Sequence, residues 1–228
     1  WDLEWELQQQ GFDFCYDKRL YDRLEKEGAE SVRLHLMADM AYQERLVRFI
    51  ENHDEPRAAA VFSPERLRAA AVAALTLPGA RLVHEGQIEG RRVRLPVFLG
   101  RRPPEASDEG LREFYCRLLE AVSDDVFKSG EWRLCECGGW PDNISYRNLA
   151  AWCWSLGEDC RLVVVNLSAS PSQGRIHLIG VSIPDQDVVL EDIFSSVSYQ
   201  RDGCEIAERG LFVDIPPWGY HFVSIRIG

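Results

Sequence analysis

The chain has 228 residues and a formal net charge of −11 at pH 7. This negative charge repels nucleic acids and anionic lipid surfaces, so it argues against a role in binding either. The length suffices for one large domain or two modest ones, and the 46% of hydrophobic and 11% of aromatic residues predict a globular protein with an apolar core. No apolar run has the length needed to cross a bilayer, and the first residues show no signal-peptide pattern.

The first clear unit is a strand, a polar loop and a helix. Residues 45–50 form a short β-type run, and the polar segment 52–57 follows its end. Ser63 is a good helix cap, and Pro64 suits the first position of a helix. Leucine and alanine then recur at helical spacing as far as the turn at 78–79. A (β/α) unit is therefore predicted.

A second strand is predicted at 80–83, and it also ends in polar residues, at 84–87. Two successive units of this kind favour parallel strands, whose chemistry sits at the carboxyl edge of the sheet. An arginine- and proline-rich insertion at 91–104 separates the second strand from a helix that begins near 107–109. The apolar residues of 111–122 lie on one face of that helix.

Between residues 121 and 131 the helical pattern gives way to short β-rich runs without helical periodicity. These runs are 150–154, 161–166, 175–181, 188–190, 211–215 and 220–227. They predict an antiparallel sandwich after the α/β part, that is, an α/β fold followed by an all-β fold. The predicted domains are 1–125 and 126–228.

The seven cysteines are an odd number and contain no CxxC pair. No zinc-finger spacing and no HExxH helix accompanies them, so the sequence identifies no metal ligands. We expect reduced cysteines that serve as small apolar side chains, and hence a cytoplasmic location.

Three stretches together resemble the α-amylase family of glycoside hydrolases. Asn52-His53-Asp54 with nearby Arg57 is similar to the family's fourth signature motif, at the end of a barrel strand. Residues 74–87 look like the family's next unit, a helix, a Leu-Pro-Gly turn and a strand. Residues 11–17 are similar to its sixth barrel strand. The resemblance implies that 1–125 holds strands six to eight of a (β/α)8 TIM barrel, and that 126–228 is the C-terminal β-sandwich domain of such enzymes.

The resemblance also implies that two catalytic carboxylates lie outside this chain. In the family the nucleophile is an Asp after the fourth strand and the general acid a Glu after the fifth, and Trp1 looks like an aromatic residue that follows this Glu. We therefore expect a C-terminal fragment of a longer protein. The fragment alone is predicted to be inactive, because retaining hydrolysis needs both carboxylates.

Asp54 is by resemblance the third catalytic carboxylate, which stabilises the oxocarbenium-like transition state. The alternative for Asp54 is a turn or helix-cap role. His53 is expected to donate a hydrogen bond to the same sugar, or else to be a satisfied histidine beneath the loop. Arg57 is expected to bind substrate or to form a structural ion pair with Glu51 or Glu55.

Glu85 and Gln87 are expected to bind substrate, because they occupy the loop after the eighth strand. Asn52 is expected to brace its loop through backbone hydrogen bonds. Asp17 either rims the same cleft or caps the next helix. The tryptophans of the second part, among them Trp152, are interpreted as core residues in preference to sugar-stacking ones.

The function predicted by the resemblance is that of an α-amylase-like retaining glycoside hydrolase or transglycosylase acting on α-glucans or maltooligosaccharides. The alternative is a non-catalytic amylase-like homologue, or a carbohydrate-binding or interaction module. No cofactor is identified, and calcium, which some relatives bind, is not assignable to residues here. The expected macromolecular partner is the rest of the parent barrel, or a second copy of the chain.

Overall fold

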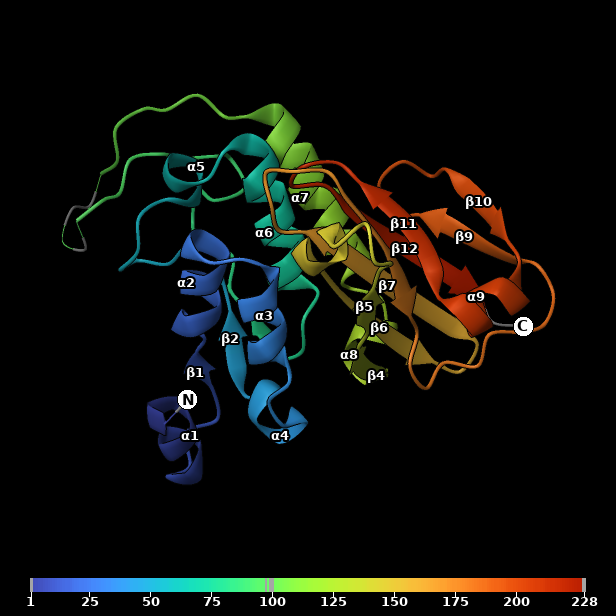
Figure 1. The fold of residues 1–228 in the computed structure, drawn as a ribbon. Helices are drawn as coiled ribbons and strands as arrows, with labels where there is room; N and C mark the ends of the chain where they lie inside the picture. The colour runs from blue at the N-terminus through green and yellow to red at the C-terminus, as the bar shows by residue number, and fades with distance from the viewer. Residues whose placement is uncertain (1, 97, 99–100, 227–228) are drawn as a thin grey trace.

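The computed structural model describes residues 2–96, 98 and 101–226. Trp1 and the last residue of the strand predicted at 220–227 lie outside them. One part of the molecule has helices around a small parallel sheet, and the other has two antiparallel sheets (Figure 1). No helix among the described residues is long and apolar enough to cross a membrane.

The first part contains a three-stranded sheet of order β1-β2-β3. Its strands are β1 (Cys15–Tyr16), β2 (Leu46–Arg48) and β3 (Ala80–Arg81). Both strand pairs are parallel, as the two (β/α) units predicted, although the strands are shorter than the predicted runs. The carboxyl ends of all three strands therefore lie at one edge of the sheet.

Two helices of this part, α6 (Pro64–Leu75) and α7 (Glu109–Ala121), begin where the sequence placed their caps. The other helices are α1 (Asp2–Gln9), α2 (Lys18–Lys26), α3 (Ala29–Leu36), α4 (Met40–Gln43) and α5 (Ala58–Val61), and the short α8 (Val126–Ser129) follows at the start of the second part. These were not predicted, except that α2 was one of the two alternatives for Asp17. The Ser63 hydroxyl accepts the Arg66 N–H at 3.3 Å at the start of α6. The Asp108 carboxylate accepts the Leu111 N–H at 2.9 Å at the start of α7. Both caps satisfy N–H groups that have no partner within the helix.

A fully buried arginine on β2 links the parallel strands. Arg48 Nε donates to the Pro78 carbonyl at 2.9 Å, just before β3, and its other nitrogens contact Asp17 and the Gln43 side chain. In the same cluster Asp17 Oδ2 also forms a hydrogen bond with His35 Nε2, at 2.9 Å. Burial alone would raise the pKa of Asp17, but the His35 hydrogen bond and the Arg48 charge hold it below its ordinary value.

Asp17 is also the cap of α2. Its Oδ1 accepts the Leu20 N–H at 3.0 Å, and its side chain is buried. Of the two roles considered for Asp17, the structure shows the cap and not the rim of a cleft.

The second part has a six-stranded sheet of order β10-β9-β12-β7-β6-β4 and a three-stranded sheet of order β11-β8-β5. Its elements are β4 (Glu131–Leu134), β5 (Glu136–Gly138), the 3-10 helix η1 (Ser145–Asn148), β6 (Leu149–Leu156), β7 (Asp159–Asn166), β8 (Ser172–His177), β9 (Val188–Asp192), β10 (Ser198–Arg201), α9 (Gly203–Arg209), β11 (Leu211–Ile215) and β12 (Tyr220–Arg226). All pairs in both sheets are antiparallel. One apolar cluster contains residues of both sheets, among them Leu149, Leu162 and Ile176.

The sequence prediction was wrong at the short elements of this part. Helices α8, η1 and α9 lie in a region in which no helix was predicted, and β4, β5 and β10 were not among the predicted runs. Helix α9 has only seven residues, between an Asp202 cap and Gly210 in the left-handed region at φ 79°, so it is too short to show helical periodicity. The strand predicted at 175–181 ends at His177.

All seven cysteines are free thiols. Cys135, Cys153 and Cys160 are buried in the cluster shared by the two antiparallel sheets. They serve there as small apolar side chains.

The two parts share the largest apolar cluster of the molecule, which contains residues from both sides of position 125. Two tryptophans of β6 donate hydrogen bonds to Thr76, at the end of α6. Trp152 Nε1 donates to Thr76 Oγ1 at 3.1 Å, and Trp154 Nε1 donates to the Thr76 carbonyl at 2.7 Å. Both tryptophans are buried, so the interpretation of them as core residues is confirmed.

We predict that Thr76→Val destabilises the chain by about 1–3 kcal/mol, because the buried Trp152 N–H loses its acceptor while the side-chain volume is kept. Thr76→Ser keeps the hydroxyl and should cost less. The free energy of unfolding in urea is the measurement, and equal losses in the two variants would contradict the proposed role of the hydroxyl.

Candidate functional site

A pocket of about 230 Å³ lies at the carboxyl edge of the parallel sheet. It is formed by the segments that follow β2 and β3 and by the insertion before α7. Its lining residues are Asn52, His53, Arg57, His84, Glu85, Arg94, Leu95 and Pro96.

The loop after β2 is shaped by the side chain of Asn52. The buried Asn52 Oδ1 accepts the N–H groups of Asp54 at 2.8 Å and Glu55 at 2.9 Å. This Asx-type turn reverses the chain, as the bracing role predicted. It leaves the side chains of His53 and Asp54 53% and 69% exposed, with Nε2 of His53 3.1 Å from Oδ2 of Asp54. A histidine and a carboxylate are thus held together at the mouth.

Glu51 and Arg57 form a buried ion pair beneath this loop. Arg57 Nη2 lies 2.9 Å from Glu51 Oε1, and Glu51 Oε2 accepts the Ala58 N–H at 2.6 Å. Burial raises the pKa of Glu51 to about 7, even though the Ala58 N–H and the Arg57 charge both favour the ionised form. Glu51 and Glu55 were both considered as ion-pair partners of Arg57, and the structure shows the pair with Glu51.

Arg57 also connects the loop after β2 to the loop after β3. Its Nη2 donates to the Glu85 carbonyl at 2.7 Å, and its Nη1 donates to His84 Nδ1 at 3.3 Å. Burial and the Arg57 charge lower the pKa of His84, which keeps its imidazole neutral. Gly86 has φ 80°, and a Cβ there would lie 2.9 Å from Arg57 Nη2, so a glycine is needed for this contact.

Gln87 does not line the pocket. Its Oε1 accepts the His84 N–H at 3.0 Å, and its Nε2 donates to the Tyr115 hydroxyl on α7 at 2.9 Å. The side chain is 2% exposed. The structure therefore gives Gln87 a packing role between β3 and α7, which differs from the substrate-binding role that the resemblance implied.

The insertion before α7 forms one wall of the pocket through Arg94, Leu95 and Pro96. The Glu105 carboxylate holds the start of the insertion, because Oε2 accepts the Arg92 N–H at 2.8 Å. At its other end Arg102 forms an ion pair with the exposed Glu85 side chain. These contacts hold the wall against the loop after β3.

The pocket brings together His53, Arg57 and Glu85, three of the five residues that the sequence singled out. Asp54 adjoins it through His53, whereas Gln87 lies behind it. His84 and Arg94 were not predicted as site residues. Their places after a strand and within a basic insertion were visible in the sequence, but nothing local showed that they share a pocket.

The side chains at the opening of the pocket include both hydrogen-bond donors and hydrogen-bond acceptors, and their positive and negative charges largely cancel. Arg57 and Arg94 donate, Asp54 and Glu85 accept, and neutral His84 does either. Such a mixture suits a ligand rich in hydroxyl groups, which both donate and accept. No group of three metal-ligating side chains is found in the described part of the chain.

No family model matches the chain. Over 172 residues it is 29% identical to the α-amylase MalA of Haloarcula japonica, a match that covers 71% of this chain and 25% of the relative. The chain thus spans about a quarter of the length of this curated relative.

Solved structures of similar fold include α-amylases. The maltogenic α-amylase AmyB of Thermotoga neapolitana has a TM-score of 0.76 at 21% identity, over 97% of this chain and 53% of that one. The α-amylase of Geobacillus thermoleovorans, complexed with acarbose, has a TM-score of 0.70 at 15% identity, over 96% and 49% of the two chains. At these identities the likeness establishes a shared fold, over about half of each solved chain.

The raised pKa of Glu51 generates a prediction about stability. The ordinary pKa of 4.5 applies in the unfolded chain, so between about pH 4.5 and about pH 7 the folded chain keeps a proton that the unfolded chain releases. The contribution of Glu51 to stability therefore falls as pH rises through this window. Relative to Glu51→Gln, the wild type should lose roughly 3 kcal/mol of unfolding free energy between about pH 5 and about pH 8.

The measurement is urea unfolding of both proteins at several pH values. Glu44→Gln changes an exposed carboxylate elsewhere and should keep the wild-type pH dependence. Parallel curves for wild type and Glu51→Gln would contradict a raised pKa at Glu51.

Proposed function

Because the chain resembles the α-amylase family of glycoside hydrolases in both sequence and fold, we propose that it is the C-terminal portion of a retaining glycoside hydrolase or transglycosylase acting on α-glucans. In this proposal residues 1–125 are strands six to eight of a (β/α)8 barrel, and residues 126–228 are a β-sandwich domain. The observation that carries it is the Asn52 turn, which presents His53 and Asp54 at the carboxyl end of β2.

Asp54 acts in this proposal on the sugar ring next to the cleaved bond. Its carboxylate accepts hydrogen bonds from sugar hydroxyls and favours the distorted, oxocarbenium-like ring of the transition state. His53, 3.1 Å away, orients the carboxylate and donates to the same sugar. Glu85, from the loop after β3, and Arg57, from the segment after β2, contribute further hydrogen bonds.

The nucleophile and the general acid come from the rest of the protein. Retaining hydrolysis places two carboxyl groups about 5 Å apart across the scissile bond. The chain supplies the stabilising carboxylate and the hydrogen-bonding wall of the site, and it is inactive alone.

We predict that Asp54→Asn lowers kcat on maltooligosaccharides by about 100-fold or more in the longer protein, because the lost charge acts chiefly in the transition state. Reducing-sugar release is the measurement. Asp142→Asn changes an exposed carboxylate in the second part and should leave activity unchanged. Activity that survives Asp54→Asn would refute the role of Asp54, and an inactive wild type would favour a non-catalytic homologue.

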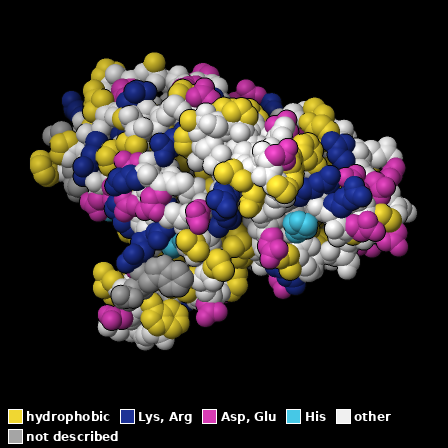
Figure 2. Space-filling view, in the orientation of Figure 1, with side chains coloured by type: hydrophobic (Ala, Val, Ile, Leu, Met, Phe, Trp, Pro, Cys, Tyr) yellow, Lys and Arg dark blue, Asp and Glu magenta, His cyan; other side chains and the backbone are white. Residues whose placement is uncertain are grey.

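The parallel sheet supports the proposed position within a barrel. One face, with Cys15 and Leu46 in register, is buried under helices. On the other face Tyr16 pairs with Val47 and is 47% exposed, and Phe12 and Phe14 before it are also exposed. Figure 2 shows hydrophobic side chains on the surface at the lower left, over the N-terminal elements. We assign this face and the open edge of β1 to the remaining strands of the barrel.

Water-exposed aromatic side chains and a free strand edge favour pairing with another chain. We therefore predict that the 228-residue chain, without the rest of the barrel, self-associates in solution. Phe14→Ser should reduce the measured mass toward that of a monomer. Leu34→Ser removes an exposed hydrophobic residue from α3, away from this face, and should have no such effect. Light scattering coupled to size exclusion measures the mass, and a monomeric wild type would count against this use of the face.

A further inference from the structure

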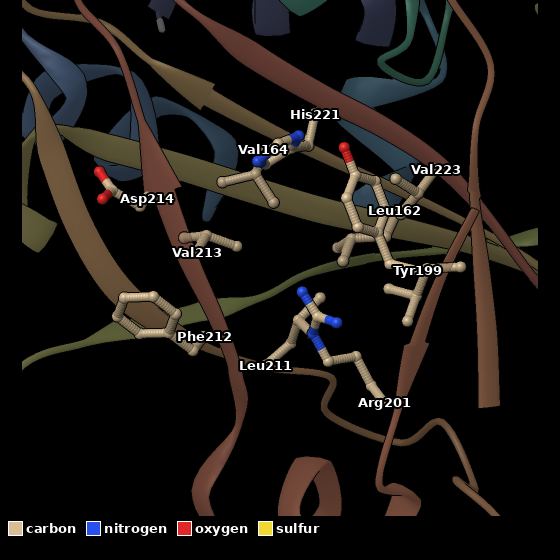
Figure 3. Close-up of a pocket in the computed structure, with 11 residues that line it drawn as sticks. Leu162, Val164, Tyr199, Arg201, Leu211, Phe212, Val213, Asp214, His221 and Val223 are labelled. Carbon is tan, nitrogen blue, oxygen red and sulfur yellow. The ribbon is translucent and has the colours of Figure 1, made fainter. Parts of the chain in front are cut away.

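A second cavity, of about 270 Å³, lies in the second part, far along the chain from the loops described above. It opens where edge strand β11 of the small sheet and edge strand β10 of the large sheet leave a gap over β7, β9 and β12 (Figure 3). This volume equals roughly nine water molecules and is near the lower end of ligand-pocket sizes.

The walls of this cavity are aliphatic. They are formed by Leu162, Val164, Leu190, Leu211, Val213 and Val223, all nearly fully buried. A sugar is a poor fit here, because several of its hydroxyl groups would face these side chains without a hydrogen-bond partner. Each such group costs about 1–3 kcal/mol. The inner part of the cavity therefore favours the hydrocarbon portion of a ligand.

The mouth carries a cation that lacks an anionic partner within the described residues. Arg201 Nη1 donates to the neighbouring Gln200 carbonyl at 2.8 Å, and the guanidinium lies 5.5 Å from the centre of the Tyr199 ring. No ion pair of Arg201 occurs in the described part of the chain. Figure 3 shows its guanidinium directed into the cavity, between Leu211 and Tyr199.

The other polar side chains leave this cation available. Asp214 on β11 accepts Gln173 Nε2 at 2.9 Å, and in Figure 3 its carboxylate lies on the side away from Arg201. His221, near the Tyr199 hydroxyl in Figure 3, has a pKa lowered by burial, which the Asp192 charge offsets in part. A neutral imidazole and a phenol hydroxyl supply donors without adding charge.

We propose that this cavity binds a small monocarboxylate with an apolar body, whose hydrocarbon part packs on the aliphatic walls while its carboxylate pairs with Arg201. Apolar burial supplies affinity, and the guanidinium fork selects the carboxylate through charge-assisted hydrogen bonds. A phosphate monoester of a sugar would match the cation but not the walls. The proposal does not depend on the α-glucan activity proposed above.

The test is calorimetric titration of the 228-residue chain with octanoate, and with octanamide as a neutral molecule of the same shape. We expect saturable 1:1 binding of octanoate, and affinity at least about tenfold weaker for octanamide, because a hydrogen bond to a charged group is lost. Arg201→Gln should weaken octanoate binding by a similar factor and leave octanamide binding unchanged. Arg209→Gln, an exposed arginine on α9 outside the cavity, should change neither.

Three results would overturn the proposal. They are absence of saturable octanoate binding, equal affinities of wild type and Arg201→Gln for octanoate, and displacement of octanoate by maltose, which would assign the cavity to a sugar. Because Arg201 is exposed on an edge strand, the variant should fold, and equal melting temperatures of wild type and variant without ligand verify this.

Discussion

The buried Arg48 is the constraint on which the geometry of the first part depends. One guanidinium contacts Asp17 after β1, Gln43 at the end of α4 and the Pro78 carbonyl before β3. A buried charge is tolerated only when it is paired and hydrogen-bonded, and loss of one partner typically costs about 3–5 kcal/mol. The three strands are thus held in one register by the requirement to satisfy one cation. Their carboxyl ends, which carry the candidate site, are positioned as a consequence.

The same principle recurs closer to the site. Arg57 and Glu51 form a second buried pair, and through the Glu85 carbonyl and His84 this pair joins the two loops around the pocket. Burial disfavours the ionised form of Glu51 and raises its pKa to about 7. A buried polar network of this kind specifies a unique arrangement of the loops more than it adds stability. The exposed His53 and Asp54 owe their placement to the Asn52 turn and to the buried ion pair beneath it.

The two parts of the chain are also physically dependent on each other. The tryptophans of β6 complete the core of the first part, and both indole N–H groups bond to Thr76. The position of the antiparallel sheets is therefore set by the end of α6, and disturbance of this contact should reach both parts. The cavity beside Arg201 lies on the opposite face of the large sheet from this contact, because Leu162 and Val164 alternate along β7 with Val163, which pairs with Trp152.

By itself the sequence determined the local units of this protein. The caps Ser63 and Asp108, the parallel units around β2 and β3, and the polar Asn52-His53-Asp54 turn follow from residues within a few positions of one another. Short elements such as α9 and β10 escaped prediction, because they contain too few residues to show a period.

Only the tertiary structure decided which side chains remain available. The Gln87 side chain is bonded to Tyr115, 28 residues away, and among the described residues Arg201 has no anionic partner. The physical reason is that hydrogen bonds and ion pairs between distant segments depend on packing, which local periodicity does not encode.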